Sequence, residues 1–100
     1  MQLQKMMKQA QKMMKDMQKA KEELATRSVE ASSGGGMVTV TASGDQKLVS
    51  IKIDPQCVDP QDVQMLEDLI LAAVNDALRQ ASKLAEDEMG RFTTGLNLPF

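Results

Sequence analysis

Alternating apolar and polar residues between positions 34 and 54 constrain the fold of this chain more than any other part of the sequence. The alternation runs in two halves, which the small and turn-prone residues 43–46 separate. The residues that share one apolar face are Val38, Val40, Ala42, Val49, Ile51 and Ile53. In this pattern Leu48 falls on the opposite face, together with Ser50 and Lys52. A period of two on both sides of a short turn predicts a β-hairpin with one face to bury.

A third strand is predicted just before this hairpin. Val29, Ala31 and Ser33 alternate with small or polar residues, which is typical of a short edge strand. Three consecutive glycines at positions 34–36 then give a permissive reversal of the chain. They lack the following helix and the Gly-Lys-Ser/Thr ending of a phosphate-binding loop. The short connections predict a three-stranded antiparallel sheet.

Residues 3–24 have the pattern of a long helix. Their apolar residues recur at alternating spacings of three and four, as in the seam between two helices that pack side by side. This apolar seam consists of Leu3, Met6, Ala10, Met13, Met17, Ala20 and Leu24. The intervening Met, Lys, Gln and Glu residues favour helix, and no Gly or Pro interrupts them.

A stripe of lysines follows the same rhythm, displaced by two positions from the apolar seam. This lysine stripe consists of Lys5, Lys8, Lys12, Lys15 and Lys19. One interpretation is a solvated outer face of the helix. The other is a surface that faces the phosphates of a nucleic acid.

A second long helix is predicted after Asp54-Pro55, which ends the third strand. Asp59 is the expected N-cap, with Pro60 at the first helical position. The apolar stripe of this helix is Val63, Leu66, Ile70, Ala73, Ala77, Ala81 and Leu84. We expect the helix to end near Met89, with Gly90 as the residue that follows its C-cap. Residues 1–90 would then form one α+β domain of order α-β-β-β-α, and residues 91–100 a flexible tail.

Helices of these lengths would extend beyond the sheet. At ~1.5 Å per residue the first is roughly 35 Å long and the second roughly 40 Å. A seven-residue strand spans about 23 Å, and three strands are only ~10–14 Å wide. The apolar surface left over predicts a homodimer, for which an exposed sheet edge offers a pairing site. We assign the dimer interface to Val38, Val40, Val49, Ile51, Ile53, Ile70 and Val74.

The residue types do not favour an enzyme or a metal site. The sequence contains no His, and its single cysteine, Cys57, is interpreted as a small buried apolar residue. No Asp- and Asn-rich loop with a closing Glu is present either. We therefore predict no catalytic residues, no metal, no cofactor and no small-molecule substrate.

The same sequence favours a cytoplasmic protein. A single cysteine fits a reducing compartment. No apolar run approaches the ~20 residues of a membrane helix. The first residues also lack the uninterrupted apolar core of a secretory signal.

Charge is distributed unevenly along the chain, although the net charge is only −2. Residues 1–27 carry seven Lys and Arg against three Asp and Glu, a net charge of +4. Residues 54–88 carry nine Asp and Glu against two Lys and Arg, a net charge of −7. A basic first helix and an acidic second helix are thus predicted in one small domain.

Several stretches together resemble the YbaB/EbfC family of bacterial nucleoid-associated proteins. The resemblance covers essentially the whole chain, and its specific parts are residues 34–40, 51–55, 65–78 and 95–99. It implies a small cytoplasmic homodimer in the nucleoid, with protruding helices likened to tweezers, that binds DNA and helps to organise the chromosome or regulate genes. It also implies a DNA-contacting surface on the helical arms. In this sequence those positions are the lysine stripe together with Arg79, Lys83 and Arg91, although Glu86, Asp87 and Glu88 interrupt the second region with negative charge.

Two functions from different classes remain open. Lysines contact phosphates well and read base edges poorly, and no aromatic residue lies among them to stack on single-stranded bases. These features favour backbone binding to duplex DNA with weak sequence preference. The alternative is a protein-interaction adaptor whose Met-rich helix grips a partner, such as a recombination or replication protein, while the lysines only keep it soluble.

Overall fold

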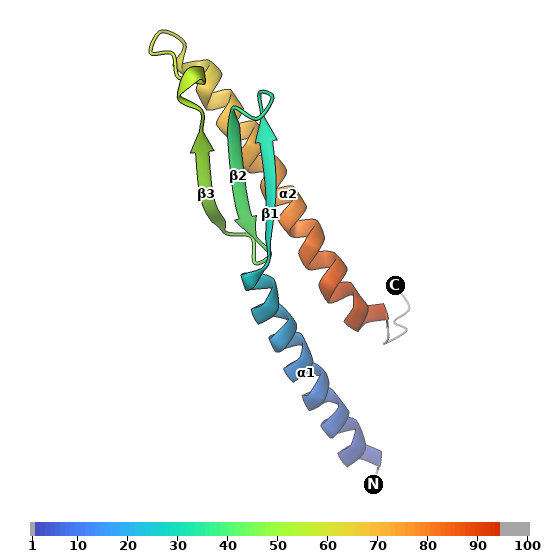
Figure 1. Cartoon of the computed structure of the whole chain (residues 1–100). Helices are drawn as coiled ribbons and strands as arrows, with labels where there is room; N and C mark the ends of the chain where they lie inside the picture. The colour runs from blue at the N-terminus through green and yellow to red at the C-terminus, as the bar shows by residue number, and fades with distance from the viewer. Residues whose placement is uncertain (1, 95–100) are drawn as a thin grey trace.

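The computed structural model describes residues 2–94 and has the element order predicted from the sequence (Figure 1). Helix α1 spans Gln2–Thr26, followed by strands β1 (Ser28–Ser33), β2 (Val38–Ser43) and β3 (Leu48–Ile53). A 3-10 turn, η1 (Pro55–Cys57), precedes helix α2 (Val63–Thr94). The predicted α-β-β-β-α order and α+β class are confirmed.

The three strands form one antiparallel sheet in the order β1-β2-β3. Ala31 pairs with Val40 and Val29 with Ala42, so these residues share one face of the sheet. That face forms the core, because Val38, Val40 and Ala42 are fully buried beneath α2. The prediction that these three residues share one apolar face is confirmed.

A β-bulge in β3 changes the face that Leu48 occupies. The register between β2 and β3 shifts at Thr41 and Ala42, so that Ala42 pairs with Leu48 while Thr41 pairs with Ser50. Leu48 therefore lies on the same face as Ala42, and the prediction that it lies on the opposite face is wrong. Val49 has no partner in the ladder, because a bulge places one extra residue on one strand.

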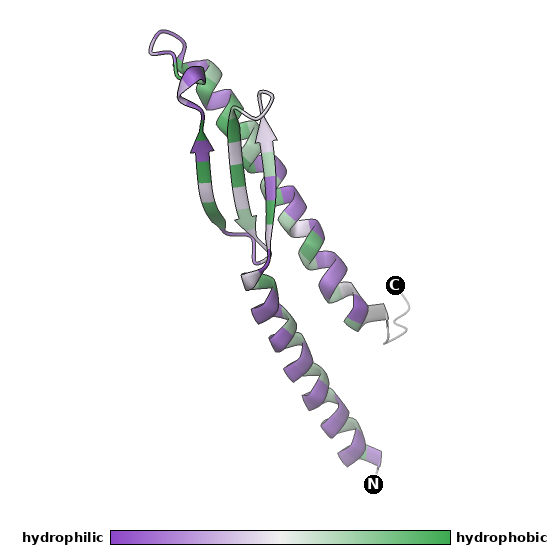
Figure 2. Ribbon diagram, viewed as in Figure 1, coloured by the Kyte–Doolittle hydropathy of each residue, from purple (hydrophilic) through white to green (hydrophobic). Residues whose placement is uncertain are grey.

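Helix α2 covers only part of the sheet. It packs mainly against β1 and β2, and its buried side chains there are Ala73, Ala77 and Ala81. Small side chains let the helix approach the sheet closely. Strand β3, here called the outer strand, is the edge strand on the side away from β1, and Figure 2 shows hydrophobic positions along it. Its apolar residues are partly exposed: Leu48 is 45% exposed, Ile51 44% and Ile53 37%.

Helix α1 projects from the sheet as an arm (Figure 1). Its buried residues are Ala20 and Leu24, close to the sheet, whereas the remainder of the helix is largely exposed. The molecule measures 72 × 26 × 16 Å, with a radius of gyration of 19.6 Å. A compact chain of this length has a radius of about 13 Å, so the protomer is strongly elongated.

The ends of α2 differ from the prediction. The helix begins at Val63, because the Asp62 side chain accepts a hydrogen bond from the Met65 amide at 3.3 Å and so caps it. Asp59, the predicted N-cap, instead accepts from the Gln61 amide at 2.9 Å within the preceding loop. At the other end α2 continues through Gly90 to Thr94, so the predicted end near Met89 is wrong. Residues 95–100 of the predicted tail lie outside the described residues.

Candidate nucleic-acid interface

The lysine stripe lies on the projecting part of α1. Lys5, Lys8, Lys12, Lys15 and Lys19 are all exposed. Each of these lysines follows a member of the apolar seam by two residues. Two residues correspond to a rotation of about 200° around a helix, so the stripe lies on roughly the opposite side from the seam. The seam itself leads into the buried residues Ala20 and Leu24. The packing of α1 on the rest of the molecule therefore leaves most of the lysine stripe turned away, while Lys19 at its end lines the space between α1 and α2.

The charges of the stripe are available to a ligand. Within residues 2–94, none of the five lysines forms an ion pair with a carboxylate. From Lys5 to Lys19 the stripe extends about 21 Å along the helix at 1.5 Å per residue. This length corresponds to about six base pairs of a duplex at 3.4 Å each. A row of solvated ammonium groups on that scale can lie along several phosphates at once.

The three cations of α2 that were predicted to contact DNA differ from the lysine stripe in their ion pairing. Arg79 forms an ion pair with Asp76 one turn earlier, and Arg91 lies 3.8 Å from Glu88. Lys83 is exposed and, among the described residues, has no carboxylate within ion-pair distance. Two of the three charges are therefore partly neutralised by the acidic helix that carries them.

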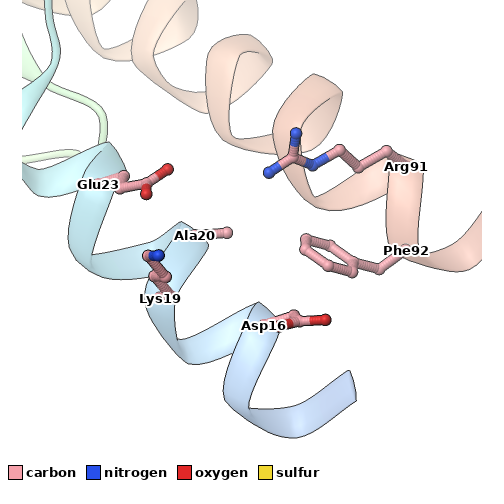
Figure 3. A pocket seen from close by; sticks show the side chains of 6 residues that line it. All are labelled: Asp16, Lys19, Ala20, Glu23, Arg91 and Phe92. Atoms are coloured by element: carbon pink, nitrogen blue, oxygen red, sulfur yellow. The ribbon is translucent and has the colours of Figure 1, made fainter. Parts of the chain in front are cut away.

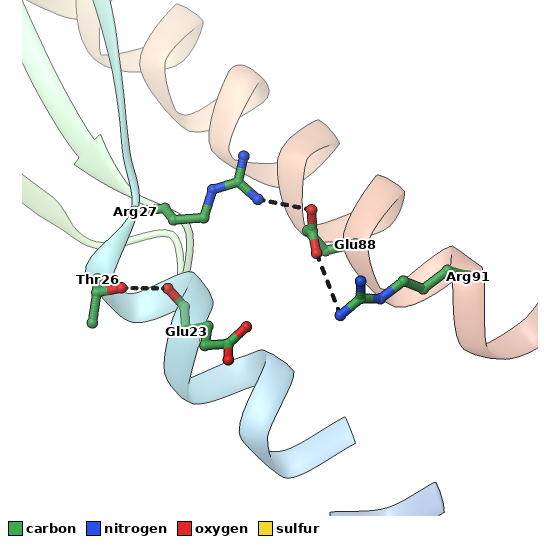
Figure 4. A network of polar contacts seen from close by, with 5 residues as sticks. All are labelled: Glu23, Thr26, Arg27, Glu88 and Arg91. Atoms are coloured by element: carbon green, nitrogen blue, oxygen red, sulfur yellow. Dashed lines mark hydrogen bonds and ion pairs between the residues drawn. The ribbon is translucent and has the colours of Figure 1, made fainter. Parts of the chain in front are cut away.

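An ion-pair network connects the base of α1 to α2 (Figure 4). The Arg27 guanidinium donates to Glu88 at 2.7 Å, and Arg91 approaches the second oxygen of the same carboxylate at 3.8 Å. Arg91 also lies over the Phe92 ring, 5.2 Å from its centroid. Glu88, which the sequence placed in an interrupting acidic run, is thus the bridge between two arginines.

A cavity of about 460 Å³ separates the two helices beyond this network (Figure 3). The residues that line it are Asp16, Lys19, Ala20, Glu23, Arg91 and Phe92. Lys19 and Arg91 are the two predicted DNA-binding residues that the fold brings together. Because two carboxylates accompany these two cations, the cavity has no excess of positive charge that would attract a phosphate.

The residues assigned to the dimer interface fall into three groups. Val38 and Val40 are fully buried inside the protomer and offer no surface to a second copy. Ile51, Ile53 and the unpaired Val49 are exposed on the outer strand. The flanking residues Ile70 and Val74 are half-buried at the margin of the core. Leu48, which the alternation assigned to the other face, joins this exposed group because of the bulge.

Sequence reasoning missed the Arg27–Glu88 pair. The two residues are 61 positions apart, and nothing local in the sequence signals their contact. A pairing of opposite charges between the end of α1 and the end of α2 could have been suspected only after both helices had been placed.

The described residues offer neither a membrane-spanning helix nor a metal-binding cluster. No helix within residues 2–94 is long and apolar enough to cross a membrane. The described residues contain no group of three His, Cys, Asp or Glu side chains that could hold a metal ion. The Cys57 thiol is buried, as predicted, and packs in the hydrophobic core.

Comparisons with known proteins agree with the sequence resemblance. The model of the YbaB/EbfC DNA-binding family matches residues 1–96. A nucleoid-associated protein of Moorella thermoacetica is 58% identical over 97 residues, which are 97% of this chain and 93% of that protein. One from Geobacillus sp. is 59% identical over 97 residues, covering 97% and 90%.

A solved structure gives the same fold. The crystal structure of an uncharacterized protein from Helicobacter pylori superposes with a TM-score of 0.72 at 24% sequence identity. The match covers 97% of this chain and 96% of that one. The family model and the similar sequences extend over nearly the whole length of the chain, and on this evidence the chain belongs to the YbaB/EbfC DNA-binding family.

Proposed function

We propose that this protein binds duplex DNA as a homodimer in the bacterial nucleoid, mainly through phosphate contacts, with a role in chromosome organisation or gene regulation. The observation that carries the proposal is the unpaired lysine stripe on a helix that projects from the body of the protein. Membership of a DNA-binding family and the names of the similar proteins support DNA as the ligand.

The chemistry of the stripe favours the DNA backbone over the bases. A lysine ammonium is a point charge that contacts phosphate without discriminating among base edges. The described residues of α1 include no aromatic side chain that could stack on an unpaired base. We therefore expect weak sequence preference. Lys83 is the α2 residue best suited to add to this surface, because Arg79 and Arg91 already have carboxylate partners.

The homodimer part of the proposal rests on the uncovered outer strand. Leu48, Ile51 and Ile53 share the core face of the sheet, yet α2 packs mainly on the other two strands. A strand with an unpaired edge and partly exposed apolar side chains is unfavourable in water, and a second copy can cover both features. Dimerisation would bring two lysine stripes to one DNA molecule.

Salt dependence of DNA binding tests the proposal. If the two arms neutralise about 4–6 phosphates, log K should fall against log salt with a slope of about −4 to −5. The measurement is an equilibrium titration of a random-sequence duplex at several salt concentrations. Affinity for any one sequence should differ little from that for the random duplex, because phosphate contacts carry no base information.

A charge-reversal variant locates the contact. Changing Lys8, Lys12 and Lys15 to Glu reverses the middle of the stripe and leaves the apolar seam intact. The matched control changes Lys21, Lys47 and Lys52 to Glu, which alters the net charge equally but leaves the stripe untouched. The stripe variant should lose most of its affinity and its salt slope, whereas the control should keep most of both.

The adaptor alternative makes the opposite prediction. If the stripe variant bound DNA as tightly as the parent at the same salt concentration, the lysines would be a solvated face. The exposed Met residues of α1 would then favour an adaptor that grips a partner helix, with recombination or replication proteins as candidates. Binding to such a partner should change little with salt, because it would depend on apolar burial.

A further inference from the structure

A single residue, Arg27, links the α1 arm to the sheet. Helix α1 ends at Thr26, and strand β1 begins at Ser28. None of residues 2–19 is buried, so the arm is held to the rest of the described chain mainly at its base. The direction in which the arm projects therefore depends on the conformation at Arg27 and on the few contacts around it.

Three groups of Arg27 are engaged by three different parts of the fold. Its amide donates to the Leu24 carbonyl at 3.1 Å, in the last turns of α1, and its carbonyl accepts from the Gly44 amide at 2.9 Å, in the β2–β3 turn. Its guanidinium donates to Glu88 of α2 at 2.7 Å (Figure 4). The first two bonds hold the backbone of the linking residue, and the third ties its side chain to the second helix.

Glu88 is held in place for this contact from the α2 side. Its side chain is 30% exposed, and its second oxygen lies 3.8 Å from Arg91, so one carboxylate lies between two cations. A hydrogen bond between ionised groups is shorter and stronger than one between neutral groups. Because both partners remain partly exposed, the pair should contribute little to the free energy of unfolding. Its effect should fall instead on the direction of the arm.

A small change of angle at Arg27 becomes a large displacement at the far end of the lysine stripe. Lys5 lies about 33 Å from Arg27 along the helix at 1.5 Å per residue. A rotation of about 10° at the base would move Lys5 by about 6 Å, which is more than one base pair of a duplex at 3.4 Å. An arm that pivots freely also loses more conformational freedom when it binds.

We propose that Arg27 is a positioning residue, which together with Glu88 fixes the direction of the α1 arm and thereby the placement of the lysine stripe. In this role its guanidinium faces α2 and does not contact DNA. The consequence for DNA binding rests on the proposed function, whereas the direction of the arm can be measured without DNA.

Distances between spin labels test the direction of the arm. In a Cys57→Ala background, nitroxides on Gln11→Cys in α1 and Asn75→Cys in α2 report the arrangement of the two helices, and both positions are exposed. Labelled protein refolded with an excess of unlabelled protein restricts the measurement to distances within one chain. Glu88→Gln and Arg27→Gln should each broaden the distance distribution. The double variant should broaden it no further, because the two side chains act through one contact.

Glu86→Gln is the matched control. It removes the same charge from the same helix, but Glu86 is exposed and, within residues 2–94, forms no ion pair. The distance distribution of this control should match that of the parent, and both variants should keep the unfolding midpoint of the parent. A distribution in Glu88→Gln as narrow as that of the parent, or equal broadening in Glu86→Gln, would overturn the proposal. A large loss of stability in Glu88→Gln would also overturn it, because the pair would then support the fold rather than orient the arm.

DNA binding gives a second readout, in which positioning and charge predict opposite changes. Glu88→Gln removes a negative charge and releases two arginines, so charge alone would tighten binding to a duplex. Positioning predicts that affinity falls about three- to tenfold at fixed salt, with the salt slope unchanged because the same lysines contact the phosphates. Glu86→Gln should bind at least as tightly as the parent.

The two readouts separate failure of this proposal from failure of the proposed function. Tighter DNA binding by Glu88→Gln would overturn the positioning role in binding. A parent protein that does not bind DNA would overturn the proposed function, and the spin-label distances would still decide whether Arg27 and Glu88 fix the arm.

Discussion

The hairpin turn at Gly44 lies directly against the end of α1, where a Cβ atom added to Gly44 would overlap the carbonyl oxygen of Leu24. The Gly44 amide donates to the Arg27 carbonyl at 2.9 Å, and the Arg27 amide donates to the Leu24 carbonyl at 3.1 Å. This contact joins the β2–β3 turn to the base of the arm. It therefore helps to set the direction in which α1 leaves the sheet.

Gly44→Ala should consequently destabilise the protein. Backbone atoms of Leu24 cannot rotate away as a flexible side chain could, so the turn or the helix end must shift. We expect a loss of about 1–3 kcal/mol in the free energy of unfolding, as for other overpacked sites. Denaturant unfolding at a fixed protein concentration measures it. An unchanged midpoint would show that the turn and the arm do not press against each other.

Gly90→Ala should have the opposite effect. Gly90 lies within α2, and a Cβ atom added there would meet no heavy atom of residues 2–94 within 4 Å beyond its own helix backbone and chain neighbours. Ala favours a helix interior over Gly by about 0.5–1 kcal/mol, so stability should rise by that amount. The same unfolding measurement applies, and far-UV circular dichroism should show no loss of helix. A decrease in stability would mean that the helix end needs the freedom of glycine.

The helices and strands of this fold could be predicted from the sequence because the periodicity that signals each of them is local. The seam of α1 and the alternation of Val38, Val40 and Ala42 each follow from side-chain periodicity within one element. The core face was therefore identified correctly. Leu48 was misplaced because a bulge adds one residue to β3, and its position depends on pairing with β2 rather than on the pattern of β3 alone.

The helix ends were harder to predict because several residues could serve the same role. Asp59 and Asp62 both suit an N-cap, and the fold uses Asp62. Gly90 suits the position after a C-cap, yet α2 continues because Arg91 pairs with Glu88 and Phe92 lines the cavity beside α1. The Arg91–Glu88 pair lies within α2, but the placement of Phe92 beside α1 involves two elements, so sequence periodicity does not reveal it. The lysine stripe could be predicted as one helical face, whereas the proximity of Lys19 to Arg91 and the ion pairs of Arg79 and Arg91 required the fold.

Cys57→Ser should cost stability without affecting DNA binding. The thiol is buried in the core at the end of η1, and a hydroxyl there needs a hydrogen-bond partner that a thiol does not. We expect a loss of roughly 1–2 kcal/mol in the free energy of unfolding if the hydroxyl stays unpaired. Cys57→Ala is the control for lost volume alone. Loss of DNA binding in a Ser variant that is still folded and dimeric would show that the thiol has a role in binding.

The outer strand provides a direct test of the proposed homodimer. Light scattering behind a sizing column, at micromolar concentration, should give about twice the chain mass of 11.0 kDa.

Ile51→Asp should shift the protein toward the monomer, because the new carboxylate would be buried without a partner between two copies. The residue is 44% exposed in the protomer, so the fold itself should tolerate the change and circular dichroism should stay the same. Ser50→Asp adds the same charge one position away, on the opposite face of β3, and should remain dimeric. A parent protein that elutes as a monomer would contradict the homodimer, and an Ile51→Asp variant that stays dimeric would show that the two copies meet elsewhere.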